Sequence, residues 1–334
     1  MRTLHFGTAS EIVGCGESSG FPRFNASDFE TQHADIHMCA LSESGDVQAR
    51  CSVWWSHVPA YKQERVGVIG HYAAASDDAA AAVLDEAQKR LRAAGCTLAI
   101  GPMNGNTWRS YRFVTDRGEQ PAFFLEPVNP PEWPLQFERA GFSSLASYFS
   151  ALNNDLSRPD PRLDALEKKI AEVGVTIRSA NPDLRRELQN IYAVSQVSFR
   201  QNFLYTEIPQ AEFISMYEPV LPVARPELVL LAERAGQCVG YLFAIPDLAQ
   251  KARGLDPNLA IDTFIVKTVS ILPQPELKGL GTLLVARAQQ LGREMGFQRC
   301  IHALMFEDNI SLNISRHYAT VMRKYTLYSK DLAK

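Results

Sequence analysis

A short apolar stretch that ends in a glycine-rich turn carries the clearest chemistry in this sequence. The apolar residues 269–272 stop at Pro273, and Gly279-Leu280-Gly281 follows where a helix is expected to begin. Glycines lack the Cβ atoms that would block close approach, so several backbone N–H groups can converge on an anion, and the helix dipole favours negative charge there. The pattern therefore predicts a phosphate-binding loop.

The residues around the two glycines do not fit the common nucleotide loops. A P-loop needs a lysine directly after the second glycine, whereas Thr282 and Leu283 follow Gly281. A dinucleotide fingerprint needs a third glycine at the position of Leu284, and no acidic residue follows at the expected distance.

The loop instead resembles the acyl-CoA loop of the GNAT (GCN5-related N-acetyltransferase) superfamily. That pattern has a hydrophobic residue two before a proline, Arg or Gln three after it, and then a Gly-x-Gly or Gly-x-Ala pair. Ile271, Pro273, Gly279 and Gly281 stand at those spacings, and Glu276 replaces the usual Arg or Gln. A carboxylate there would repel a pyrophosphate unless a neighbour such as Lys278 screens it.

The residues after the loop extend the resemblance. Apolar residues recur at helical spacing over 280–295, Gly296 stands where it would end the helix, and the apolar strand 300–306 follows. Asn309 matches the asparagine that opens the next GNAT helix. The resemblance implies that acetyl-CoA or another acyl-CoA is bound, without a metal, by Val269, Ile271, Leu277, Lys278, Gly279, Leu280, Gly281, Thr282 and Asn309.

The resemblance also suggests catalytic groups. A backbone N–H of Val269 or Ile271 would polarise the thioester carbonyl. A GNAT tyrosine often protonates the leaving thiolate seven residues after the asparagine; Arg316 stands there, and Tyr318 two residues later is the candidate, with a role in the core or pocket wall as its alternative. Glu307, at a strand end beside the cleft, is a candidate base through a water, or a solvated carboxylate without that role.

Lys267 interrupts an expected apolar strand over 263–271. A buried ammonium needs a partner. By the period of two, Lys267 shares a face with Ile265, Val269 and Ile271, so it either reaches the transfer cleft or extends to a sheet edge. It could hold a substrate carboxylate, or pair with Asp262 or Glu307.

Two further segments are candidates for the acceptor site. By resemblance, the segment after the first helix of the second half overhangs the acceptor pocket, so Asn202, Phe203 and Tyr205 are candidates for its wall; for the two aromatic residues the alternative, packing of the domain, is favoured. The loop 101–112 collects Trp108, Tyr111 and two arginines and could either face the cleft or hold the two halves together; we favour the second role.

The order of elements in the second half is also found in the first. An apolar strand over 66–72, a helix capped at Ser76 and ended at Gly95, and a strand over 96–100 repeat the order of 264–306. No phosphate loop is present, because Ser76-Asp77-Asp78 stands between strand and helix. We therefore expect an α/β protein of two GNAT-like domains in tandem, each a mixed, mostly antiparallel twisted sheet flanked by helices, with a degenerate half at 1–157 and an acyl-CoA-binding half at 158–334.

Composition narrows the function classes. The 334 residues carry 34 basic and 37 acidic side chains, a net charge of −3, which argues against a nucleic-acid partner. No apolar run is long enough to span a membrane, and six scattered cysteines without a C-x-x-C pair predict reduced thiols, so we expect a cytoplasmic protein. A homodimer is left open.

Two functions remain from different classes. The first is an N-acyltransferase that uses acyl-CoA to acylate a small-molecule amine by direct transfer in a ternary complex. The second is a non-catalytic GNAT-like protein that binds CoA or a metabolite as a sensor or scaffold.

Overall fold

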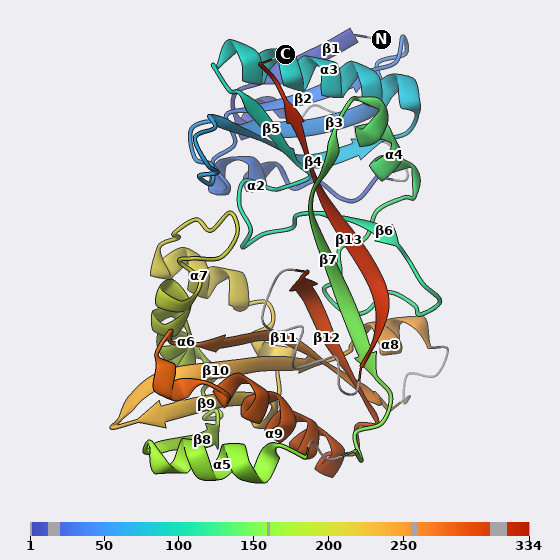
Figure 1. The fold of residues 1–334 in the computed structure, drawn as a ribbon. Helices are drawn as coiled ribbons and strands as arrows, with labels where there is room; N and C mark the ends of the chain where they lie inside the picture. The colour runs from blue at the N-terminus through green and yellow to red at the C-terminus, as the bar shows by residue number, and fades with distance from the viewer. Residues whose placement is uncertain (1, 13–20, 159–160, 255–259, 308–318, 334) are drawn as a thin grey trace.

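The computed structural model describes residues 2–12, 21–158, 161–254, 260–307 and 319–333, and one continuous sheet runs through both halves of the chain (Figure 1). The strand order is β1-β2-β3-β4-β5-β13-β7-β12-β11-β10-β9-β8, and β6 pairs with β13 off this path. The strands of the first half are β1 (Arg2–Phe6), β2 (Ile36–Leu41), β3 (Val47–Trp54), β4 (Val66–Ala74), β5 (Leu98–Gly101), β6 (Phe113–Asp116) and β7 (Ser143–Asn153). Those of the second are β8 (Val175–Ser179), β9 (Val229–Arg234), β10 (Gln237–Pro246), β11 (Thr263–Ile271), β12 (Arg299–Phe306) and β13 (Thr320–Asp331).

Helices cover the sheet on both faces. The first half contributes α1 (Ala9–Ile12), α2 (Ala26–Thr31), α3 (Asp77–Ala93) and α4 (Glu132–Arg139). The second contributes α5 (Leu163–Glu172), α6 (Leu184–Ser198), α7 (Gln210–Tyr217), α8 (Ala249–Arg253) and α9 (Leu280–Glu294), with 3-10 turns at Leu221–Val223, Pro226–Leu228 and Pro275–Leu277.

The two longest helices of the repeated unit begin differently. The Ser76 side chain accepts a hydrogen bond from the Ala79 amide and caps α3, and Gly95 follows the helix with φ +82°. Gly279 precedes α9 in the left-handed region, with φ +103° and no side-chain cap, and Gly296 follows the helix with φ +94°. A left-handed residue strains any side chain but glycine, so Gly279 is required by the backbone itself.

Both halves contain the expected order of antiparallel strands, a parallel pair and a crossover helix. β4 and β5 are parallel from Val66–Leu98 to Val68–Ile100, and β11 and β12 are parallel from Thr263–Arg299 to Val266–His302. The predicted α/β fold with a mixed, mostly antiparallel sheet flanked by helices is therefore confirmed for both halves.

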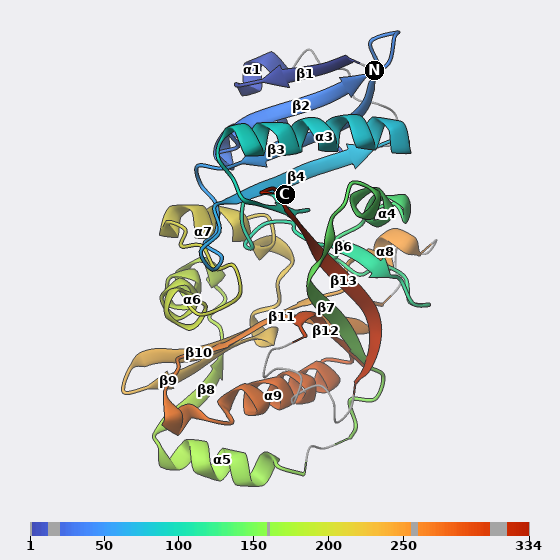
Figure 2. The ribbon, with the colours of Figure 1, turned by 45° about the horizontal axis from the view of Figure 1, so that its top comes forward.

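The two halves exchange their last strands. β13, from the second half, lies between β5 and β7 of the first, and β7 lies between β13 and β12 (Figures 1 and 2). Each of these long strands thus completes the sheet of the other half. The domain boundary near residue 157 stays a prediction. β7 from before this boundary pairs with β12 from after it, and β13 from after it pairs with β5 from before it.

Alternating side chains divide the second half into two cores. Tyr241, Phe243 and Ile245 of β10 pack toward α6 and α7, while Leu242 and Ala244 pack toward α5 and α9. This period of two buries both faces, as expected of a sheet covered by helices on both sides.

Candidate active site

A cleft opens where two parallel strands separate. β11 and β12 are paired only as far as Val266–His302, although β11 continues to Ile271 and β12 to Phe306. Beyond that point β12 stays with β7, and β11 stays with β10. The resulting cleft has a volume of about 880 Å³ and is lined by β11, β12, the segment after α6, and loops of the first half.

A β-bulge places Lys267 at the mouth of this opening. Val266 pairs with Ala244 and Thr268 with Phe243, so Lys267 is the extra residue. The bulge breaks the period of two: Ile265 packs in the core below α6, whereas Val269 and Ile271 pack against the core below α9. The prediction that Lys267 shares a face with all three residues is therefore wrong.

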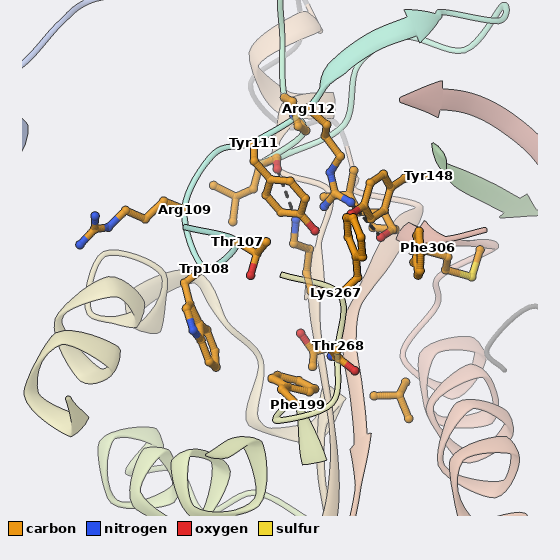
Figure 3. Close-up of a pocket in the computed structure, with 18 of the residues that line it drawn as sticks. Thr107, Trp108, Arg109, Tyr111, Arg112, Tyr148, Phe199, Lys267, Thr268 and Phe306 are labelled. Atoms are coloured by element: carbon orange, nitrogen blue, oxygen red, sulfur yellow. Dashed lines mark hydrogen bonds between the residues drawn. The ribbon is translucent and has the colours of Figure 1, made fainter. Parts of the chain in front are cut away.

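Lys267 reaches into the cleft without a carboxylate partner among the described residues. Its ammonium donates a hydrogen bond to the Leu125 carbonyl at 3.3 Å (Figure 3). Of the two partners considered, Asp262 pairs instead with Arg299 at 2.8 Å, and Glu307 is exposed. Burial, and next the charge of Arg112, lower the pKa of Lys267 from 10.5 to about 8, while Glu126 raises it.

Arg112 lies beside Lys267, held between two aromatic rings. Its guanidinium carbon is 3.9 Å from the ring centre of Tyr111 and 4.1 Å from that of Tyr148. The residue is only 7% exposed, and its Nη1 donates a long hydrogen bond of 3.5 Å to the Leu304 carbonyl. Its Nε is buried without a partner among the described residues. Figure 3 shows Arg112, Tyr111, Tyr148 and Lys267 gathered at one end of the cleft, while the Arg109 guanidinium points away from them.

A buried network supports this end of the cleft. Glu126 lines the cleft and accepts hydrogen bonds from Arg323 at 2.7 Å and from the Tyr325 hydroxyl. Tyr325 in turn contacts Ser150 at 2.9 Å, and the Ser150 hydroxyl accepts a hydrogen bond from the Leu304 amide at 3.0 Å. Because the Glu126 and Arg323 side chains are 1% and 5% exposed, the pair links the loop of the first half to β13 and fixes both.

The predicted acceptor wall lines the cleft. Asn202, Phe203 and Tyr205 are all lining residues, and Phe203 stacks on Phe306 with ring centres 5.4 Å apart. The Tyr205 hydroxyl donates to Gln196 at 2.7 Å, which fixes its ring. Whether these residues bind an acceptor stays a prediction.

The loop 101–112 has both of the roles considered for it. The Trp108 indole donates to the Thr206 carbonyl at 2.7 Å, and Arg109 pairs with Glu212, so the loop does hold the halves together. The same loop contributes residues 107–112 to the cleft lining. The preference for an exclusively structural role is thus corrected.

The start of α9 has the features that anion binding needs. Within the described part of the chain, the amides of Gly279, Leu280, Gly281 and Thr282 donate no hydrogen bond, and the first turn has no acidic side chain. Leu277 and Leu280 are buried and anchor the turn in the core, and the Lys278 carbonyl accepts from Lys169. Four free N–H groups at a helix start form a binding place for phosphate oxygens.

Glu276 is neutralised by a residue that the sequence did not indicate. Arg234, at the end of β9, pairs with Glu276 at 3.2 Å and donates to Gln274 at 2.6 Å. The screening expected from Lys278 is therefore provided by Arg234.

The equivalent place in the first half is closed. After β5 the chain stays bonded to β4, through the Met103 amide to the Ile69 carbonyl and the His71 amide to the Asn104 side chain, both at 2.8 Å. At the start of α3, Asp77 pairs with Arg139 and lines, with Glu132, a smaller hollow of about 470 Å³. Carboxylates there oppose a phosphate.

The structure gives the remaining candidates no catalytic contact among the described residues. Glu307 is exposed and does not line the cleft. Asn309 and Tyr318 fall outside the described residues. His302 lines the cleft but is buried and contacts Gln289 at 3.1 Å, and burial lowers its pKa to about 4.

The sequence did not point to several residues of the site. Glu126 and Tyr148 line the cleft but lie in a loop and a strand of the first half, where no catalytic site is predicted. Tyr325, which supports Glu126, lies in a strand that no local pattern predicts. The described residues contain no group of three or more His, Cys, Asp or Glu side chains arranged to hold a metal, and none of their helices is long and apolar enough to cross a membrane.

Comparison with known proteins identifies the fold. No protein-family model matches the chain, and no curated protein sequence matches it. Among solved structures, a GCN5-related N-acetyltransferase from Sphaerobacter thermophilus matches with a TM-score of 0.51 and 13% identity, over 99% of this chain and 96% of the other. A tandem GNAT protein from the clavulanic acid biosynthesis pathway matches with a TM-score of 0.50 and 13% identity, over 99% and 98%.

A third similar structure belongs to a much longer protein. A GCN5-related glucosamine N-acetyltransferase region in a fungal multi-domain GH3 β-N-acetylglucosaminidase matches with a TM-score of 0.54 and 12% identity. The match covers 98% of this chain and 38% of that protein. The fold is therefore the tandem GNAT fold.

Proposed function

We propose that this protein is an acyl-CoA-dependent N-acyltransferase, with acetyl-CoA as the expected donor, that acts on a small-molecule amine by direct transfer in a ternary complex. The observation that carries the proposal is the combination, in one half, of a helix start with four free amides and a strand pair that separates into a cleft. The tandem GNAT fold supports the same reading.

The residues present fit a pyrophosphate at the start of α9. The free amides of Gly279, Leu280, Gly281 and Thr282 would bind its oxygens, and Arg234 offsets the charge of Glu276. When bound, acyl-CoA supplies the thioester that the amine attacks. Val269 lines the cleft and Ile271 does not, which favours the Val269 amide as the group that holds the carbonyl.

The cleft would orient the amine and exclude water. Phe199 and Tyr205 both pack against Trp108 on one side of the cleft, and Phe203 stacks on Phe306, which contacts Tyr148 near Arg112 and Lys267. The amine must lose a proton before it attacks, and the thiolate must gain one. We retain Glu307 as the proposed base and Tyr318 as the proposed acid.

Thiol release with a library of amines tests this proposal. Acyl transfer should require both acetyl-CoA and an amine, and the Gly281→Asp protein should lack it. Tight CoA binding without turnover across the library would favour a sensor or scaffold instead, and absence of CoA binding by folded protein would refute the assignment of the loop.

A further inference from the structure

The charges that line the cleft do not balance. Of the four charged side chains among the described lining residues, Arg109 pairs with Glu212 and Glu126 pairs with Arg323. The other two are both cations, Arg112 and Lys267, and neither has a carboxylate within ion-pair distance in the described part of the chain. The cleft therefore has an excess of positive charge at one end.

Arg112 is held for contact with a planar ligand. The rings of Tyr111 and Tyr148 cover its guanidinium at 3.9 and 4.1 Å, so its N–H groups are left to donate in the plane of the guanidinium. One of them donates weakly to the Leu304 carbonyl, and the Nε is buried without a partner in the described structure. An unsatisfied buried N–H of a cation is costly, and a bound anion would remove that cost.

The backbone at Arg112 supports the same conclusion. Arg112 has φ +70°, a left-handed conformation that costs a non-glycine residue energy. Its amide is fixed by a hydrogen bond of 2.9 Å to the Pro102 carbonyl. The fold thus keeps a strained backbone conformation that directs this side chain between the two tyrosines.

Lys267, on β11, adds a second cationic donor near Arg112 (Figure 3). The bulge turns it into the cleft beside Tyr111, where its ammonium donates to the Leu125 carbonyl at 3.3 Å. An ammonium has three donors, so two are left for a ligand. The planar guanidinium of Arg112 and the ammonium of Lys267 together suit a carboxylate, whose two oxygens can accept hydrogen bonds from both side chains.

We propose that Arg112 and Lys267 bind a carboxylate of the acceptor, so that the substrate is an amine that also carries a carboxylate. This inference rests on the proposed acyl transfer and specifies its substrate class. The aromatic side chains of Phe199 and Phe203, which line the same cleft, would pack against the body of such a molecule.

Matched sets of amines test the proposal in the unmodified protein. Each set contains an amino acid, its carboxamide and its decarboxylated amine, with aromatic, aliphatic or acidic side chains across the sets. Binding to CoA-saturated protein is measured by calorimetry, and transfer by thiol release. At least one amino acid should bind about 10-fold or more tightly than both relatives that lack the carboxylate, because these relatives lose a charge-assisted bidentate contact. Equal binding of all three, or binding of no amino acid by protein that binds CoA, overturns the proposal.

Variants distinguish a binding role from a structural one. Arg112→Gln and Lys267→Met should each weaken the amino acid about 10-fold or more and change the carboxamide by less than about 2-fold. Arg112→Lys keeps the charge but loses the fork, so its affinity should lie between. Exposed Arg287→Gln and Lys168→Met serve as controls. Equal weakening of acid and carboxamide would mean that the cations only support the cleft; if Arg112→Gln does not fold, Lys267→Met and the unmodified protein still decide.

The two proposals can fail separately. Transfer to amines regardless of a carboxylate would leave the N-acyltransferase proposal intact and refute the anion site. Carboxylate binding that depends on Arg112 and Lys267, without any CoA binding, would support the anion site and refute the N-acyltransferase proposal.

Discussion

Replacing Lys267 by methionine is expected to stabilise the protein at neutral pH. Its pKa is lowered from 10.5 to about 8, mainly by burial, so the charged form is disfavoured in the folded state. At about 1.4 kcal/mol per unit, a shift of about 2.5 units costs about 3 kcal/mol. Methionine keeps most of the volume and loses the hydrogen bond to the Leu125 carbonyl, worth about 1 kcal/mol. The net gain should be about 2 kcal/mol.

The pH dependence gives this prediction a distinctive sign. Below pH 8 the lysine is charged in both states, so the whole cost is present. Between pH 8 and 10.5 the unfolded chain binds the proton and the folded protein does not, so the stability of the unmodified protein rises with pH. The advantage of Lys267→Met should therefore shrink above pH 8 and vanish at about pH 9.5, where the remaining cost equals the lost hydrogen bond of about 1 kcal/mol; above about pH 10.5 the variant should be less stable by about that amount.

Urea unfolding of the unmodified protein, Lys267→Met and the exposed control Lys168→Met from pH 7 to 10 measures this difference. A loss of about 2 kcal/mol or more in Lys267→Met at pH 7 would refute the reasoning, because it would make Lys267 half of a structural ion pair. The acceptor site would then have to be sought around Asn202, Tyr205 and Glu307.

Three further results are expected. Gly281→Asp should weaken CoA binding at least about 100-fold in calorimetry while the helix start is kept or strengthened by the acidic side chain, whereas neutral Gly281→Ala should bind nearly normally; unchanged affinity of folded Gly281→Asp would refute the loop assignment. Saturating CoA should bind at one molecule per chain, because the first half is closed to a second molecule: the chain after β5 stays hydrogen-bonded to β4, and carboxylates line the start of α3. A stoichiometry near two would contradict this. Glu126→Gln should lower the unfolding free energy by about 3 kcal/mol, because it leaves Arg323 buried without its anion, whereas exposed Glu119→Gln should have little effect; equal stability of the two variants would show that the network is dispensable.

Local patterns predicted most of the fold. The Ser76 cap and the glycines at 95, 279 and 296 are each determined by neighbours in sequence, and they place the repeated unit and the predicted phosphate loop. The bulge at Lys267 was not predictable in this way, because it depends on how β11 pairs with β10. One extra residue reversed the face of Val269 and Ile271 and turned Lys267 into the cleft.

The cationic end of the cleft could not be predicted from local sequence, because its contacts join residues far apart in the chain. Arg112 stands out in the loop 101–112, but its partners Tyr148 and Leu304 lie far along the chain. No local pattern joins Glu126 to Tyr325 either, since the contact exists only because β13 returns to the first half. Pairing across such distances is a property of topology, and a single sequence does not encode it in any periodicity.

The exchange of β7 and β13 also constrains how the chain can be made. β13 follows every other strand in the sequence, yet it occupies the place between β5 and β7. Until β13 has been synthesised, the edges of β5 and β7 that pair with it are therefore left unpaired, and such edges can pair with strands of other chains. Ribosome-bound chains that stop before β13 should be protease-sensitive in the first half as well as in the second. Folding of this protein is then a single late event rather than two successive ones, and the halves, although duplicated, are not independent units of assembly.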